Sequence, residues 1–227
     1  MYIILLLAIV LYLISEYLHR SLSSSASKTL YVVLMLPGTI VHEFSHALVA
    51  LLMGARITNF SVIPSGDTLG RVEHTNPKIP VIGNFAISIA PLIGCPAILL
   101  LISKYLGIHF NYLPGSFDIL TETLSLLEGS LSFIMGLDYL NWKTYVFLYL
   151  ALALGAGAAP SKKDITYMIP GLIIIVVAIL ALNYFGINIP YLNIIVSWIS
   201  VALTIAIIPL LTITAMVAML RLIAVVK

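Results

Sequence analysis

Long runs of apolar residues constrain this chain more than any other feature of its sequence. Several of them reach the roughly 20 residues that a helix needs to cross a hydrocarbon core of about 30 Å. Hydrophobic residues make up 61% of the 227 residues and charged residues only 9%, far from the composition of a soluble domain. Because the runs are continuously apolar and do not alternate with polar residues, they predict membrane helices and not the strands of a barrel.

Hydropathy predicts about six crossings, so the expected fold is an all-α polytopic membrane protein. The expected ranges are 2–18, 29–54, 80–106, 144–159, 167–186 and 191–224. The first run lacks a basic segment and a cleavage site of small residues, so we interpret it as a retained helix and not as a signal peptide. No connection is long enough for a soluble domain, and residues 1–227 are expected to form a single integral membrane domain with its core at about 29–165.

Two connections between the crossings carry patterns of their own. Residues 57–63 are β-prone, residues 65–67 supply turn chemistry and residues 69–72 provide a possible return strand. These residues predict a small β-hairpin between the second and third crossings. The connection 108–142 combines four acidic residues with an apolar patch, and we expect an interfacial or re-entrant helix there.

The distribution of basic residues predicts the orientation. An N-terminus in the cytoplasm gives that side seven basic residues and the opposite side four, which favours both termini in the cytoplasm. The two groups are Arg56, Arg71, Lys78, Lys162, Lys163, Arg221 and Lys227 against Arg20, Lys28, Lys104 and Lys143. A high isoleucine content with few thermolabile residues is typical of a heat-adapted prokaryote, so a prokaryotic cell membrane is expected.

Charge and cysteine content exclude other classes of function. The net charge of +2 includes no dense basic stretch, which gives no support for a nucleic-acid partner. Cys95 is the only cysteine, so the chain has neither an intramolecular disulfide nor a cysteine-rich metal site. Any bound metal must therefore be held by His, Asp or Glu.

The second crossing contains the pattern His42-Glu43-Phe44-Ser45-His46, or HExxH. Residues four apart lie on the same face of a helix, so both imidazoles can reach one ion while Glu43 lies beside it. Three ionisable side chains within a membrane helix need compensation, because each costs about 2.5–3.5 kcal/mol at the bilayer centre. A tetrahedral zinc site that faces the interior of the bundle supplies it, and the alternative is a structural polar cluster.

A catalytic zinc site typically has a third protein ligand, which must come from elsewhere in the chain. Asp164 is the strongest candidate, because it follows a run of small residues and Pro160, which would end the fourth crossing and let the carboxylate turn inward. The alternative is a loop acid paired with Lys162 or Lys163. The other candidates are Glu16, Asp67, Glu73, Asp118, Glu122, Glu128, Asp138, His19, His74 and His109.

Three stretches resemble the motifs of the site-2 protease family of intramembrane zinc metalloproteases. The first is Leu36-Pro37-Gly38-Thr39-Ile40-Val41 leading into His42 to His46, and the others are Ala90 to Gly94 and Pro160 to Asp164. The chain departs from the family at two positions, where Gly157 replaces the usual Asn and Ile165 replaces the Gly after the Asp. The resemblance covers the core from the second crossing to Asp164 and indicates a divergent member.

This resemblance implies a zinc-dependent metalloendopeptidase that cleaves peptide bonds in or near transmembrane segments of membrane proteins. It implies one Zn²⁺ per chain, held by His42, His46 and Asp164, with Glu43 as general base. The edge of the predicted hairpin offers a surface where an extended substrate could pair, although the hairpin could equally pack over the site. The competing functions are a ZIP-like metal transporter and a non-catalytic binder of membrane proteins; the absence of His, Asp and Glu from the last two crossings disfavours transport.

Overall fold

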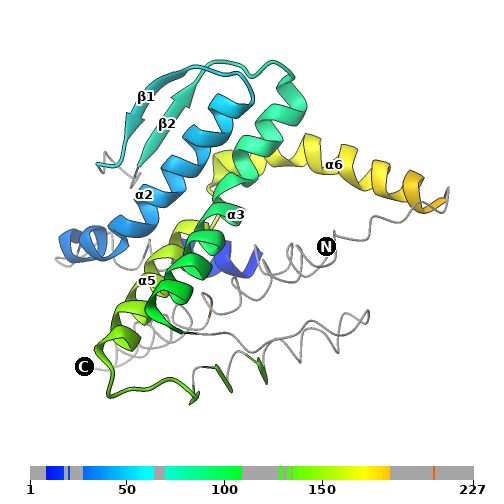
Figure 1. Ribbon diagram of the computed structural model, residues 1–227. Coiled ribbons are helices and arrows are strands. Elements are labelled where there is room, and N and C mark those ends of the chain that lie inside the picture. Colours follow the sequence, from blue (N-terminus) through cyan, green and yellow to red (C-terminus); the bar gives the residue numbers. More distant parts are fainter. Residues whose placement is uncertain are drawn as a thin grey trace, which may run out of the picture.

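The computed structural model describes residues 9–17, 20, 28–63, 70–108, 128–129, 132–133, 135–184 and 207. Within them the chain is mostly helical, with one small sheet (Figure 1). The labelled helices are α2 (Lys28–Leu52), α3 (Pro80–Leu106), α5 (Trp142–Ala158) and α6 (Lys162–Tyr184), and the strands are β1 (Ile57–Ser61) and β2 (Arg71–His74). Residues 9–17 are helical as well.

Two helices are long and apolar enough to cross a membrane: Val32–Leu52 within α2, and α3. A third candidate is the pair formed by Trp142–Ala158 and Lys162–Ile174, which meet at a bend of 64°. The structure therefore supports a helical membrane protein with two or three candidate crossings among the described residues. It does not confirm six crossings, because residues 2–8 of the first expected crossing and all of 191–224 except Ile207 lie outside the described residues. Most of the connection 108–142, where an interfacial or re-entrant helix is expected, lies outside them as well.

The hairpin that the sequence predicts between the second and third crossings is present. Strands β1 and β2 are antiparallel, with Phe60 opposite Val72 and Ser61 opposite Arg71. The register shifts between Ile57 and Asn59, and the return strand is Arg71–His74, two residues later than the expected 69–72. Both strands lie beside α2 (Figure 1).

Helices α2, α3 and α5 pack against one another around a buried apolar core. Fully buried side chains in this core include Cys95 and Leu99 from α3 and Phe147 and Leu154 from α5. Residues 9–17 contribute Leu11 to the same core. Helix α6 packs against α3.

Small residues allow α2 and α5 to approach at backbone distance. A Cβ at Gly38 would lie 1.8 Å from the carbonyl oxygen of Ala153, and one at Gly157 would lie 2.5 Å from the carbonyl oxygen of Gly38. No larger residue fits at this crossing without moving a helix. Helix α2 continues through Pro37, and Gly38 serves the contact with α5.

Candidate metal centre

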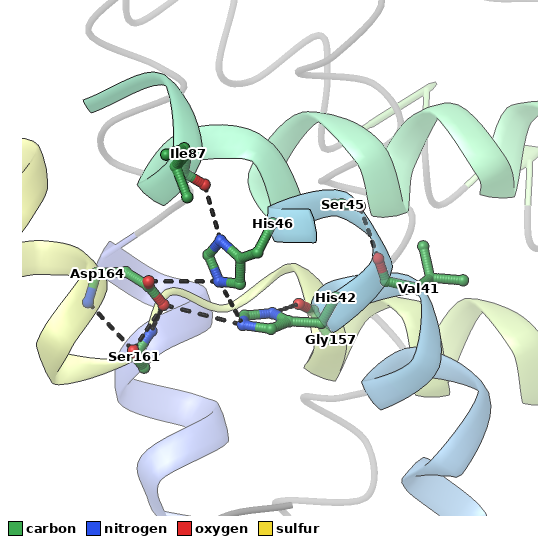
Figure 2. A network of polar contacts seen from close by, with 8 residues as sticks. All are labelled: Val41, His42, Ser45, His46, Ile87, Gly157, Ser161 and Asp164. Carbon is green, nitrogen blue, oxygen red and sulfur yellow. Dashed lines mark hydrogen bonds and ion pairs between the residues drawn. The ribbon is translucent and has the colours of Figure 1, made fainter. Parts of the chain in front are cut away.

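Three side chains that the sequence predicts as metal ligands converge in the structure. His42, His46 and Asp164 each offer one ligand atom, and these atoms lie within 4.8 Å of one another. His46 Nε2 lies 3.1 Å from His42 Nε2 and 3.3 Å from Asp164 Oδ1. Asp164 Oδ2 lies 3.8 Å from His42 Nε2. Figure 2 shows the two rings from α2 and the carboxylate from α6 facing one another.

Backbone carbonyls on two other helices orient the histidines. His42 Nδ1 donates to the carbonyl oxygen of Gly157 on α5 at 2.6 Å, and His46 Nδ1 donates to that of Ile87 on α3 at 2.7 Å (Figure 2). A carbonyl oxygen only accepts, so each ring carries its proton on Nδ1. In the neutral imidazole each Nε2 is then left as an acceptor aimed at the partner ring and at Asp164.

The break between α5 and α6 places Asp164. Helix α5 ends at Ala158, Pro160 lies in the gap, and Ser161 precedes the first residue of α6. The backbone N–H and the hydroxyl of Ser161 donate to Asp164 Oδ2 at 2.8 and 2.6 Å, and the backbone N–H of Asp164 donates to the Ser161 hydroxyl at 3.1 Å. This reciprocal pairing is a capping box with aspartate as its acid. It fixes the carboxylate so that Oδ1 faces His46.

The arrangement of these atoms fits a metal ion. The two Nε2 atoms and a carboxylate oxygen of Asp164 lie close together. Because both rings carry their proton on Nδ1, no proton lies between these three acceptor atoms. Their lone pairs therefore repel one another unless a cation lies among them. With bonds of about 2.0–2.1 Å, the donor atoms of a tetrahedral zinc site lie roughly 3.3 Å apart, similar to two of the three separations. Asp164 and His46 are 7% and 8% exposed, so water screens the charge poorly.

Glu43 lies on α2 between the two histidines and is also buried, with 7% of its surface exposed. Gly70, just before β2, covers it: a Cβ at Gly70 would lie 2.8 Å from Glu43 Oε1 and 2.9 Å from the Thr39 methyl group. The hairpin therefore lies directly over the acid. A larger residue at position 70 would displace either the hairpin or Glu43.

The other candidate ligands that the structure describes lie outside this group. Glu16 accepts from Arg20, Glu73 pairs with Arg71, His74 Nδ1 contacts the Thr75 carbonyl, and Asp138 accepts from the Leu140 N–H. Glu128 is exposed. His19, Asp67, His109, Asp118 and Glu122 lie outside the described residues.

Sequence reasoning did not identify three groups that hold the site together: Ser161 and the carbonyls of Ile87 and Gly157. A sequence pattern does indicate the role of Ser161, because Ser161-Lys162-Lys163-Asp164 has the spacing of a capping box at the start of a helix. Backbone carbonyls carry no side-chain signature. Their partners therefore emerge only once the helices are packed.

Comparison with protein-family models gives a match over part of the chain. Residues 2–109 match the family model described as Peptidase M50B-like. The match includes α2 with its two histidines, the hairpin and α3, and it ends before Asp164. No curated protein and no solved structure matches the chain. The resemblance in the motifs is thus confirmed by an independent comparison: residues 2–109 are similar to the M50B-like peptidases, a site-2 protease family domain.

Proposed function

We propose that this protein is an intramembrane zinc metalloprotease that hydrolyses peptide bonds in or near the transmembrane segments of membrane proteins. The convergence of the His42, His46 and Asp164 acceptors beside the buried Glu43 carries this proposal. The family match supports a site-2 protease-like metallopeptidase in general. The apolar helices support a location in the membrane.

His42, His46 and Asp164 would hold the metal ion, one per chain, and Glu43 would act as the base. When bound, zinc would supply a Lewis acid that polarises the scissile carbonyl and makes water a better nucleophile. Glu43 accepts a proton from the attacking water and delivers it to the leaving nitrogen, so the carboxylate is regenerated at the end of the cycle. The water's oxygen joins the carbonyl carbon as the C–N bond breaks, without an acyl-enzyme.

The hairpin is suited to presenting an extended substrate beside Glu43. Because β1 and β2 form a two-stranded sheet, each of them has an outer edge with backbone groups that another strand can pair with. We infer that the unwound part of a substrate helix adds to one of these edges. A cysteine at Phe60, which is 45% exposed, should then form disulfides with cysteines near the cleavage site of a substrate. Crosslinking no stronger than that from a cysteine at Tyr105, 89% exposed near the end of α3, would contradict this role.

The finer topology is also proposed: six crossings in a prokaryotic cell membrane, with both termini in the cytoplasm. Cys95 is buried, so Cys95→Ala provides a cysteine-free background for labelling in whole cells. A membrane-impermeant maleimide should label a cysteine at Leu140, which is fully exposed in the connection before α5, and not one at Lys78, before α3. The reverse labelling would invert the orientation.

The experiment that tests the proposed function measures zinc content and proteolysis on the same preparations. Wild type, Glu43→Gln and His46→Ala are purified in detergent, zinc is determined by mass spectrometry, and a model transmembrane substrate is followed by electrophoresis. We expect near-stoichiometric zinc in wild type and in Glu43→Gln, with cleavage by Glu43→Gln about 10²–10⁴-fold slower because proton transfer is lost. His46→Ala should lose the metal.

Two matched controls make the result specific. His74→Ala removes a histidine on β2 that lies outside the group and should leave the zinc content unchanged. Glu16→Gln removes the charge of a half-buried acid outside the group and should leave cleavage unchanged. A wild type without metal, or a Glu43→Gln variant that cleaves at the wild-type rate, would contradict the proposed function.

A further inference from the structure

The two carbonyls that orient the histidines share an unusual property: neither has its regular partner within its own helix. In an α-helix the carbonyl of residue i accepts from the N–H of residue i+4. The corresponding residue for Ile87 is Pro91, which has no N–H. The corresponding residue for Gly157 is Ser161, which lies beyond the end of α5 and donates to Asp164 Oδ2.

We propose that Pro91 is a positioning residue of the metal centre: it leaves the Ile87 carbonyl free to accept the Nδ1–H of His46, which keeps Nε2 directed at Asp164. The inference rests on the proposed function, because it treats His46 as a ligand. For His42, the free carbonyl that accepts Nδ1–H is provided by the end of α5 at Gly157. For His46, it is provided on α3 by Pro91, which leaves the Ile87 carbonyl free.

Burial explains why such a residue is needed. His46 is 8% exposed and Ile87 is 4% exposed, so the Nδ1–H has little access to water and requires a protein acceptor. The free carbonyls of a helix normally lie in its last four residues, yet Ile87 lies in the second turn of a helix that continues to Leu106. A proline four residues later provides a free carbonyl at that depth, and its ring also crowds the carbonyl away from the helix axis.

The same helix contains an internal comparison. Pro96 is buried in α3 like Pro91, and the carbonyl that it leaves without a helical partner is that of Leu92, which belongs to the apolar core. Replacing either proline by alanine restores one helical hydrogen bond and removes a similar ring volume. Only the change at position 91 introduces an N–H that competes with His46 Nδ1–H for the Ile87 carbonyl.

The test uses the full-length protein in detergent with three changes. Pro91→Ala adds an N–H at position 91, Pro96→Ala is the matched control, and a third sample has lactic acid at position 91, which gives the alanine side chain on an ester without N–H. Zinc affinity is measured by competition with a chromophoric chelator. Histidine ¹⁵N spectra of the metal-free proteins report which ring nitrogen of His46 carries the proton.

We expect Pro91→Ala to weaken zinc binding about 10–100-fold, the usual effect of losing a hydrogen-bond partner of a ligand. Its His46 spectrum should lose the pure Nδ1–H signature. The ester should restore both towards wild type, and Pro96→Ala should leave both unchanged. This rescue separates the hydrogen bond from the packing of the proline ring, which Pro91→Ala alone would not do.

Two results would overturn the inference. Wild-type zinc affinity and an unchanged His46 spectrum in Pro91→Ala would show that the Ile87 carbonyl serves both partners at once. An ester as weak as Pro91→Ala would assign the effect to the ring and not to the N–H. A wild type that binds no zinc would contradict the proposed function instead, and the spectra of the metal-free proteins would still decide the role of Pro91.

Discussion

The first turn of α6 contributes to two polar clusters of opposite character. On the inner side, Asp164 faces His42 and His46, and 7% of its surface is exposed. On the outer side, Lys162 Nζ lies 3.6 Å from Glu16 Oε1, which also accepts from Arg20 at 2.6 Å. Lys162 and Asp164 are thus two residues apart in one helical turn, yet each belongs to a different cluster. In both clusters the acid lies at a comparable distance from its basic partners.

The difference between the clusters lies in the solvent around them. The side chains of Lys162 and Arg20 are 70% and 69% exposed, so water screens their attraction to Glu16 and exposed pairs of this kind contribute little. In the inner cluster water is largely absent, and an acceptor without a partner is costly. We therefore expect large effects from changes in the inner cluster and small ones in the outer cluster, although each is built around one carboxylate.

The largest effect should follow from Asp164→Asn, which preserves the shape of the side chain and removes its charge. Without the carboxylate the centre retains two neutral imidazoles, so zinc affinity should fall by more than the roughly 100-fold upper range for losing an outer hydrogen-bond partner. Chelator competition measures the change. The matched control is Asp138→Asn, because Asp138 accepts from the Leu140 N–H in the turn before α5 and should not affect zinc. Equal zinc affinity in both variants would remove Asp164 from the ligand set.

The next effect concerns the approach of α2 and α5, on which the inner cluster depends. Gly38→Ala places a Cβ 1.8 Å from the Ala153 carbonyl oxygen, and a backbone atom cannot move aside as a flexible side chain can. We expect the helices to separate at a cost of about 1–3 kcal/mol, visible as a lower midpoint of thermal unfolding in detergent. Separation would also carry the Gly157 carbonyl away from His42 and weaken zinc binding.

The control for Gly38→Ala is Ile40→Ala on the same helix, because Ile40 is 43% exposed. Its unfolding midpoint should change less than that of Gly38→Ala. A Gly38→Ala protein with the wild-type midpoint would mean that α2 and α5 are free to repack, and the close approach would then not be what positions His42.

The residues of the inner cluster that could be predicted from the sequence are those whose positions depend on neighbours close in the chain. His42, Glu43 and His46 follow from helix periodicity alone, since a spacing of four residues places both rings on one face. Asp164 could be selected because Pro160 predicts a helix end, and the structure has that end at Ala158 with a bend of 64° before α6. The hairpin follows from β-prone residues beside turn residues, and its second strand begins two residues later than expected.

The remaining determinants could not be predicted because they depend on packing between helices. The Ile87 and Gly157 carbonyls come from residues that are 41 and 115 positions from the histidines that they orient. No side-chain pattern marks a backbone acceptor, and only the contact between α2 and its neighbours shows which carbonyl a ring reaches. The number of crossings and the orientation depend on segments such as 191–224, of which the structure describes only Ile207, so they stay predictions.

A smaller effect is expected from Ser161→Ala, which removes the hydroxyl but keeps the backbone N–H that donates to Asp164 Oδ2. Loss of this N-cap should reduce the free energy of unfolding by about 1 kcal/mol. Zinc affinity should fall about tenfold, because the carboxylate gains freedom to rotate away from His46. Ser161→Thr retains the hydroxyl and should restore both quantities. A loss of stability without any loss of zinc affinity would mean that the cap shapes α6 but does not orient the ligand.

The smallest effect should come from Glu16→Gln in the outer cluster. The variant removes the charge that Arg20 and Lys162 share, yet exposed ion pairs typically contribute only about 0.2–1 kcal/mol. We expect zinc affinity and cleavage to match wild type, and the unfolding midpoint to change slightly and less at high salt, since salt already screens the charges. If Glu16→Gln instead released zinc, the outer cluster would be holding the first turn of α6 in place. Burial would then not be what distinguishes the two clusters, because the exposed pair would be controlling the position of Asp164.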